Sequence, residues 1–246
     1  MIIIKIQDYS EMSRKAAQII ATQVTAKPDS VLGLATGSTP VGTYQELIRY
    51  HKEDGLSFHK VTTVNLDEYY GLAPSHEQSY HRFMRETLFD HIDILPDNTY
   101  IPDGLASDPH SYGKEYDELI VSLGGIDLQL LGIGSNAHIA FNEPGRFFSA
   151  QTWLVDLNQH TIEDNARFFG SKDKVPRQAI TMGMKSILGA KRILILASGV
   201  GKAKAVKDMV EGQIDPMVPA SILQLHSDVT LIADRPALSL LSSQIR

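Results

Sequence analysis

Four short polar segments each follow a run of apolar residues, and together they hold most of the side chains that could do chemistry. They are residues 34–40 (LATGSTP), 64–70 (VNLDEYY), 131–145 (LGIGSNAHIAFNEPG) and 197–203 (ASGVGKA). Ligands of open α/β sheets bind beyond the carboxyl ends of the strands, so these segments are where a site is expected.

The segment 34–40 is suited to an anion such as phosphate. Gly37 permits a tight turn, Ser38 or Thr39 could cap a following helix, and Pro40 suits the first helical position. Helix N-terminal amides together with the hydroxyls of residues 36, 38 and 39 would form a cradle for phosphate. The alternative is an ordinary capped helix start. The pattern is neither a Walker loop nor GxGxxG, so it does not support nucleotide binding.

Two adjacent carboxylates, Asp67 and Glu68, follow the apolar run at 62–66. A carboxylate at the carboxyl end of a strand is a candidate general base. Neighbouring side chains of an extended segment point to opposite sides, so at most one of the two should enter a site. The alternative is that one caps the next turn and the other is solvated.

The segment 131–145 contains His138, the side-chain type best suited to move protons near neutral pH, and Glu143, which could orient it. The alternative is a structural, hydrogen-bonded histidine. Lys202 could meet an anion at a helix end, or it could simply be solvated. No metal site is expected, because HExxH is absent and His76 and His81 are five residues apart.

Short apolar runs that alternate with amphipathic stretches must position these segments. We expect strands at 2–6, 30–35, 62–66, 99–101, 128–131, 193–197 and 229–232, and helices near 9–25, 40–53, 78–90, 108–123, 176–189 and 201–212. This order predicts the α/β class, with a doubly wound, mostly parallel sheet and helices on both faces. Since no linker or repeat divides the chain, residues 1–246 are expected to form a single catalytic domain.

The composition excludes several classes of function. The chain has 246 residues, 23 Lys+Arg against 29 Asp+Glu (net charge −6), and no Cys. Zero Cys excludes disulfides, thiolate metal sites and cysteine nucleophiles. The negative charge argues against a nucleic-acid partner, and no apolar run approaches a membrane span. The start of the chain becomes charged too quickly for a signal peptide, so we expect a cytoplasmic protein.

The chain resembles the glucosamine-6-phosphate deaminase family. The motifs that carry the resemblance cover about residues 30–235: LATGSTP at 34–40, NLDEYYGL at 65–72, SYHRFM at 79–84, GIGSNAHIAFNEPG at 132–145, NARFF at 165–169, QAITMGM at 178–184, SGVGKAKA at 198–205 and LQLHSDVT at 223–230.

The resemblance implies a hydrolase of amino-sugar catabolism, in N-acetylglucosamine utilisation. It would convert D-glucosamine 6-phosphate and water to D-fructose 6-phosphate and ammonia, without metal or organic cofactor, on a Rossmann-like fold of the sugar-phosphate isomerase/lactonase type. His138 would open the pyranose ring with support from Asn136 and Glu143. Asp67 would remove the C2 proton and return a proton at C1.

The resemblance also implies the residues around the phosphate, which are Thr36, Gly37, Ser38, Thr39, Arg167 and Lys202. Arg can bind phosphate through two parallel hydrogen bonds, and Lys acts as a point charge. Arg167 falls in the polar segment at about 157–176, which we expect to be a mobile lid. The alternative to a lid is that this segment is an ordinary surface loop.

Three features depart from the family pattern. Asn136 stands where many members have Asp, so Glu143 should carry more of the electrostatic task. Ala137 replaces the usual Gly and would be strained at positive φ. Some hexameric family members are activated by N-acetylglucosamine 6-phosphate through basic residues just after the third polar segment. The corresponding residues here, 149–155, contain no Lys or Arg, and the chain ends at Arg246, earlier than in those members. We therefore expect no activation by N-acetylglucosamine 6-phosphate, and a monomer or small homo-oligomer.

Two other functions stay open at this point. The first is 6-phosphogluconolactonase or another sugar-phosphate isomerase on the same fold. Asp67 discriminates against the lactonase, because lactone hydrolysis needs no base at C2. The second is a sugar-phosphate-sensing regulator, which would usually need a helix-turn-helix extension and basic charge.

Overall fold

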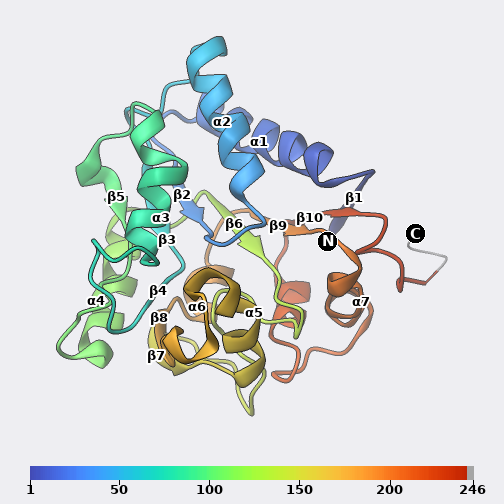
Figure 1. The fold of residues 1–246 in the computed structure, drawn as a ribbon. Helices are drawn as coiled ribbons and strands as arrows, with labels where there is room; N and C mark the ends of the chain where they lie inside the picture. The colour runs from blue at the N-terminus through green and yellow to red at the C-terminus, as the bar shows by residue number, and fades with distance from the viewer. Residues whose placement is uncertain (243–246) are drawn as a thin grey trace.

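A seven-stranded, all-parallel sheet forms the centre of the computed structural model, which describes residues 1–242 (Figure 1). The strand order is β1-β10-β9-β6-β2-β3-β5. The strands are β1 (Ile2–Ile6), β2 (Val31–Leu34), β3 (Thr62–Asn65), β5 (Thr99–Tyr100), β6 (Leu128–Gly132), β9 (Ile193–Ala197) and β10 (Val229–Asp234). All seven lie where apolar runs predict them. Residues 243–246, the end of the expected domain, lie outside the described part.

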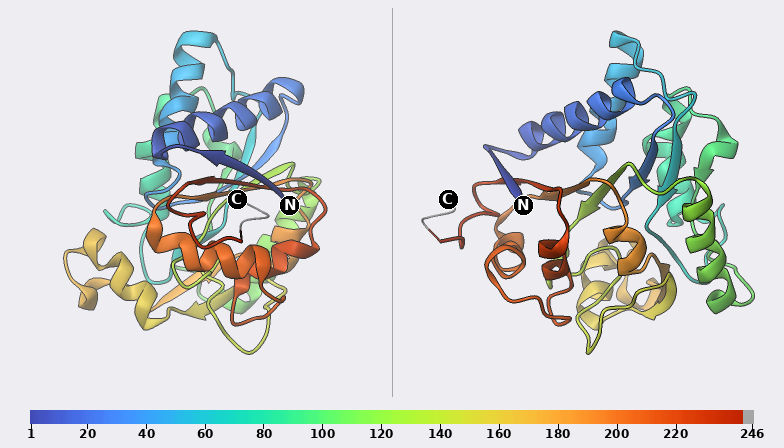
Figure 2. Two further views of the ribbon diagram at one scale, coloured as in Figure 1. Left: turned by 90° about the vertical axis from the view of Figure 1, so that its right-hand side faces the viewer. Right: turned by 180° about the vertical axis from the view of Figure 1, so that it is seen from behind.

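Helices cover both faces of this sheet, because its strands are apolar on both sides. In β9, Leu194 and Leu196 pack in one core, whereas Ile193 and Ile195 pack in the other. The first core is covered by α1 (Tyr9–Ala26), α2 (Val41–Asp54) and α3 (Tyr80–Thr87), and the second by α4 (Pro109–Ser122), α6 (Met184–Leu188) and α7 (Ala203–Glu211). Figure 2 shows α1 and α2 on one side of the sheet and α7 on the other. The predicted doubly wound α/β class is confirmed.

The chain reverses its direction across the sheet between two neighbouring strands, β2 and β6. From β2 it proceeds outward to β3 and β5, and from β6 outward to β9 and β10. The loops that follow β2 and β6 therefore leave the same edge of the sheet and diverge. Such a switch point is the usual ligand site of this architecture.

A second, three-stranded antiparallel sheet was not predicted. It consists of β4 (Asp67–Tyr69), β8 (Gln178–Thr181) and β7 (Trp153–Asp156), in the order β4-β8-β7. The helix expected over 176–189 is wrong, because these residues form β8 followed by α6. The β8 sequence, Gln-Ala-Ile-Thr, is too short to favour a strand over a helix. Pairing with β4 and β7, both distant in sequence, makes it the central strand of this sheet.

The segment expected as a lid contains a helix that the sequence analysis also omitted, α5 (Gln159–Phe169). Asn158 caps it by accepting a hydrogen bond from the His160 amide, and Gly170 ends it in the left-handed conformation. Ile162 packs with Tyr69 of β4 in a small core beside the second sheet. The helix thus lies against the part of the molecule that carries Asp67.

Candidate active site

A cavity of about 150 Å³ lies beyond the carboxyl ends of β2 and β6, at the switch point of the sheet. Its wall includes eight of the predicted site residues: Thr36, Gly37, Ser38, Thr39, Asp67, His138, Arg167 and Lys202. Asn136 and Glu143 lie behind His138 and contact it. The structure therefore brings all ten predicted residues into one constellation, from segments spread over 167 positions, Thr36 to Lys202.

The loop after β2 forms one end of the cavity. Gly37 has φ of +88°, a value that favours glycine. The Tyr9 hydroxyl of α1 braces the loop, since it donates to the Ser38 carbonyl at 3.0 Å and accepts from the Gly42 amide at 2.9 Å. This contact aligns the start of α2 with the loop.

The expected capping of α2 by Ser38 or Thr39 is wrong. The N-cap of α2 is Pro40, and it makes no side-chain capping bond. Both hydroxyl-bearing residues instead contribute to the wall of the cavity. The loop thus fits the phosphate hypothesis better than the alternative of an ordinary capped helix.

Two cations lie at this same end of the cavity. Arg167 of α5 donates from Nη2 to Ser38 Oγ at 3.3 Å. Burial lowers the pKa of Lys202, and the Arg167 charge lowers it further, against the opposing effect of Asp164. A bound dianion would relieve the repulsion between these two cations.

Asp67 begins β4 and is almost fully buried, with 5% of its surface exposed. Its carboxylate makes no hydrogen bond with the side chains or backbone amides of residues 1–242. Burial raises its pKa well above the usual value, and the neighbouring charge of Glu68 raises it further. A buried carboxylate that holds its proton strongly and faces a cavity is a candidate general base.

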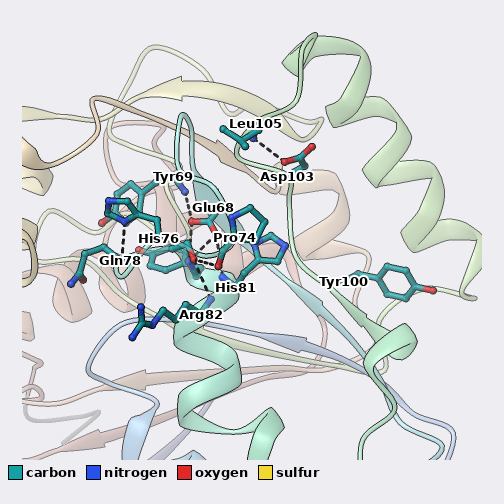
Figure 3. A network of polar contacts seen from close by, with 12 residues as sticks. Glu68, Tyr69, Pro74, His76, Gln78, His81, Arg82, Tyr100, Asp103 and Leu105 are labelled. Atoms are coloured by element: carbon teal, nitrogen blue, oxygen red, sulfur yellow. Dashed lines mark hydrogen bonds and ion pairs between the residues drawn. The ribbon is translucent and has the colours of Figure 1, made fainter.

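Glu68 does not line the cavity. Its carboxylate lies at the start of α3, close to His81, and caps that helix (Figure 3). Its carboxylate accepts from the amides of Tyr69 at 2.8 Å, Tyr80 at 2.8 and 2.9 Å, and His81 at 3.1 Å. It also faces His81 Nδ1 at 3.0 Å. Asp67 lines the cavity and Glu68 does not, which agrees with the prediction that at most one of the two acidic residues enters a site. Capping is the right interpretation for Glu68, and solvation is wrong for Asp67.

His138 faces the cavity from the loop after β6, and Glu143 lies behind it. Glu143 Oε2 is 3.5 Å from His138 Nδ1. The Asn136 amide joins them, because Nδ2 donates to Glu143 Oε2 at 2.9 Å and Oδ1 accepts from the His138 backbone amide at 3.2 Å. Burial opposes ionisation of Glu143, but contacts with His138, Thr161 and Asn136 outweigh it, so its pKa is lowered.

The backbone of this loop is unusual around His138. Ala137 has φ of +68° and Ala140 has φ of +51°, so the condition under which Ala137 would be strained is met. Gly134 packs directly under the imidazole, and a Cβ there would lie 2.4 Å from ring atoms of His138. The shape of this loop therefore requires glycine at position 134, where a side chain would clash with His138, and a strained backbone at Ala137.

Two further residues touch this site and were not among the predicted site residues. Tyr80 lines the cavity; burial raises the pKa of its hydroxyl, which is hydrogen-bonded to Tyr69 and Thr36. Thr161 of α5 lies beside His138. Tyr80 belongs to the SYHRFM motif, so the family resemblance could have indicated it as a site residue. Thr161 lies in no such motif, and the sequence shows only that it belongs to a polar segment.

No three His, Asp or Glu side chains among residues 1–242 are arranged to hold a metal ion. In the same range, no helix is both long enough and apolar enough to cross a bilayer.

Comparison with known proteins identifies the family. The family model described as glucosamine-6-phosphate isomerases/6-phosphogluconolactonase matches residues 7–232. The chain belongs to this family. The glucosamine-6-phosphate deaminase of Halothermothrix orenii is 56% identical over 235 residues, covering 96% of this chain and 98% of the relative. That of Geobacillus sp. is 54% identical over 246 residues, covering 100% and 98%.

Solved structures with the same fold include a deaminase and a lactonase. A structure described as a monomeric glucosamine-6-phosphate deaminase superposes with a TM-score of 0.95 at 52% identity, covering 98% of this chain and 100% of that one. The 6-phosphogluconolactonase of Trypanosoma brucei has a TM-score of 0.78 at 21% identity, with 98% of each chain covered. The second match shows a shared fold only.

Proposed function

We propose that the protein is a glucosamine-6-phosphate deaminase, a hydrolase that converts D-glucosamine 6-phosphate and water to D-fructose 6-phosphate and ammonia. The observation that carries this proposal is the buried carboxylate of Asp67 in the same cavity as His138 and the phosphate loop. Proton abstraction beside a carbonyl needs such a base, whereas hydrolysis of a lactone does not. The names of the relatives at 52–56% identity support the same reaction.

The first step in this proposal is opening of the pyranose ring. His138 takes the proton of the C1 hydroxyl and delivers a proton to the ring oxygen, so that the C1–O bond of the ring breaks and an aldehyde forms. Glu143 stabilises the imidazolium that arises in between, because its lowered pKa keeps it ionised. Asn136 positions both residues through its amide.

The second step moves a proton between two carbons. Asp67 removes the C2 proton of the open aldehyde while the carbonyl oxygen takes up a proton, which gives an enolamine. Asp67 then returns its proton to C1 while the amino nitrogen gives up a proton, so that a C=N bond forms at C2. The resulting imine at C2 adds water and expels ammonia, which leaves the ketone of fructose 6-phosphate. The raised pKa of Asp67 makes it a stronger base than an exposed aspartate, and burial excludes competing water.

The substrate phosphate is assigned to the end of the cavity formed by Thr36, Gly37, Ser38 and Thr39. Arg167 and Lys202 supply positive charge there. We further propose that residues 157–176, which include α5, act as a lid over a single catalytic domain. Their contact with the phosphate loop through Arg167 and Ser38 supports this role, because bound phosphate would strengthen it.

Several finer properties belong to the same proposal. The enzyme would act in the cytoplasm on amino sugars derived from N-acetylglucosamine. It would need no metal or organic cofactor and bind neither nucleic acid nor membranes. We propose a monomer or a small homo-oligomer without activation by N-acetylglucosamine 6-phosphate; the monomeric structural neighbour supports the small assembly. A sigmoidal rate curve that this effector abolishes would refute the lack of activation.

The decisive experiment is incubation of the purified protein with glucosamine 6-phosphate, following ammonia and fructose 6-phosphate together. We expect both products in equal amounts, and no hydrolysis of 6-phosphogluconolactone above the spontaneous rate. The absence of ammonia with the wild type, or full activity in Asp67→Asn, would overturn the assignment.

A further inference from the structure

We propose that Thr161 is a positioning residue, which holds the imidazole of His138 in the tautomer that ring opening requires. Through it, the single helix α5 supports both ends of the substrate. This inference rests on the proposed function, since ring opening by His138 is part of it. It assigns to the expected lid a task beyond covering the cavity.

The contacts of Thr161 place its hydroxyl between the two groups of the proton relay. Thr161 is 1% exposed, its Oγ1 lies 3.4 Å from His138 Nδ1, and its side chain is among the groups that lower the pKa of Glu143. A hydroxyl has one proton to donate and lone pairs to accept with. It can therefore accept a hydrogen bond from Nδ1–H while it donates to the carboxylate.

This arrangement determines which ring nitrogen carries the proton. A neutral imidazole has one donor and one acceptor nitrogen, and the hydrogen bond at one nitrogen fixes the role of the other. With Nδ1 protonated toward Thr161 and Glu143, Nε2 is the basic nitrogen. Nε2 has no hydrogen-bond partner within residues 1–242, and His138 lines the cavity.

Glu143 alone holds the ring weakly. Its Oε2 lies 3.5 Å from Nδ1, at the long end for a hydrogen bond, and the distance to Thr161 is little shorter. Two weak contacts that converge on Nδ1 restrict the ring more than either does alone. Such contacts often tighten only when the substrate is bound.

The same helix reaches the other end of the cavity. Arg167 of α5 bonds Ser38 of the phosphate loop, and it lies six residues after Thr161, about 9 Å along a helix axis. That spacing suits a hexose phosphate whose C1 lies near His138. At the start of α5, the Asn158 backbone amide donates to Glu143 Oε1 at 3.3 Å. Binding of the phosphate would therefore steady the helix that orients the ring-opening pair.

A simple packing role for Thr161 is separable from this one, because the chain offers a matched control. Thr43 of α2 is fully buried, and its hydroxyl has no hydrogen-bond partner among the described residues. Thr→Val at either position removes a buried hydroxyl from a helix and keeps the β-branched shape. Only at position 161 does the change remove a contact to His138.

The experiment compares Thr161→Val, Thr161→Ser and Thr43→Val. Steady-state kinetics with glucosamine 6-phosphate gives kcat and KM, and ¹⁵N NMR of histidine-labelled protein gives the tautomer of His138, assigned with His138→Asn. We expect Thr161→Val to lower kcat roughly tenfold with KM within about twofold. Its His138 should lose the predominance of the Nδ1–H form. Thr161→Ser should recover most of kcat, and Thr43→Val should retain the wild-type kcat and spectrum.

A Thr161→Val protein with the wild-type His138 spectrum, or with full kcat, would overturn the proposal. So would an equal loss of kcat in Thr161→Ser. Failure of the proposed function is recognised separately, because the wild-type protein would then release no ammonia. The tautomer of His138 would still report whether Thr161 holds the ring.

Discussion

Two acidic side chains of the candidate active site, Asp67 in the wall of the cavity and Glu143 behind His138, have opposite environments. Asp67 has no hydrogen bond with the described residues, and burial raises its pKa. Glu143 is also largely buried, but Asn136, Thr161, His138 and a backbone amide surround it, and its pKa is lowered. One carboxylate is thus prepared to take a proton and the other to remain charged. The difference in hydrogen bonding, and not in residue type, separates the two roles.

The largest expected effect follows from removing the base without changing its shape. Asp67→Asn should lower kcat/KM at least about 1,000-fold, because the amide cannot take the C2 proton. Ammonia release from glucosamine 6-phosphate measures the loss, and binding of fructose 6-phosphate, measured by calorimetry, is the control that the cavity is intact. Residual activity within tenfold of the wild type would remove Asp67 from the mechanism.

The raised pKa of Asp67 also predicts how activity and stability depend on pH. The acid limb of kcat/KM should lie above the usual aspartate range, because Asp67 must be ionised to act. Since its pKa is higher in the folded than in the unfolded protein, the folded state binds more protons between the two values. The free energy of unfolding therefore falls as pH rises through that interval. In Asp67→Asn no buried carboxylate ionises, so this loss of unfolding free energy is absent. The variant should therefore unfold at a higher urea concentration than the wild type at neutral pH.

Behind His138, the change Glu143→Gln should lower kcat roughly 100-fold, because a neutral side chain cannot stabilise the imidazolium of His138. The change in kcat is measured from the ammonia released at saturating substrate, in samples stopped at fixed times. An unimpaired Glu143→Gln enzyme would refute the electrostatic task assigned to Glu143.

A third carboxylate, Glu68, sharpens the comparison because it neighbours Asp67 and is fully buried. Glu68→Gln should destabilise the fold by about 2–3 kcal/mol, since several amides at the start of α3 would lose a charged acceptor. Urea unfolding followed by circular dichroism measures the change, with Asp67→Asn as the matched control of opposite sign. If both variants were equally destabilised, the two carboxylates would not have the separate roles described.

Asn136→Asp tests what keeps Glu143 ionised. The Asn136 amide donates to Glu143 Oε2 at 2.9 Å, and a carboxylate in its place would repel that oxygen and raise the pKa of Glu143. We expect activity about tenfold below the wild type under acidic conditions and close to it under alkaline conditions. A pH–rate profile that overlies that of the wild type would show that the Asn136 contact is unimportant.

The smallest expected effect concerns the backbone beside His138. Ala137→Gly should raise stability by about 0.5–1 kcal/mol, because glycine adopts positive φ without strain. Thermal unfolding measures the gain, and activity should stay within about twofold of the wild type. A loss of stability would mean that the methyl group of Ala137, which is buried, contributes more by packing than the strain costs.

Much of the fold was predictable because the central sheet is apolar on both faces. Its strands appear as separate Ile, Val and Leu runs, such as 193–197 and 229–232, that need no knowledge of their neighbours. The small sheet was not predictable in this way. Its strands are only three or four residues long, and β8 is a strand because β4 and β7 pair with it. A segment as short as β8 does not distinguish strand from helix by itself.

The sequence alone determined the chemical groups and the architecture that displays them. Polar segments after apolar strands predicted that Asp67, His138 and residues 36–39 share a site, because parallel strands present their following loops at one edge of the sheet. Only the tertiary structure decided the surroundings of each group. Asp67 and Glu68 are adjacent and chemically alike, yet one faces the cavity without hydrogen bonds and the other caps a helix. Their ionisation depends on burial and on partners from distant segments, which no local pattern specifies.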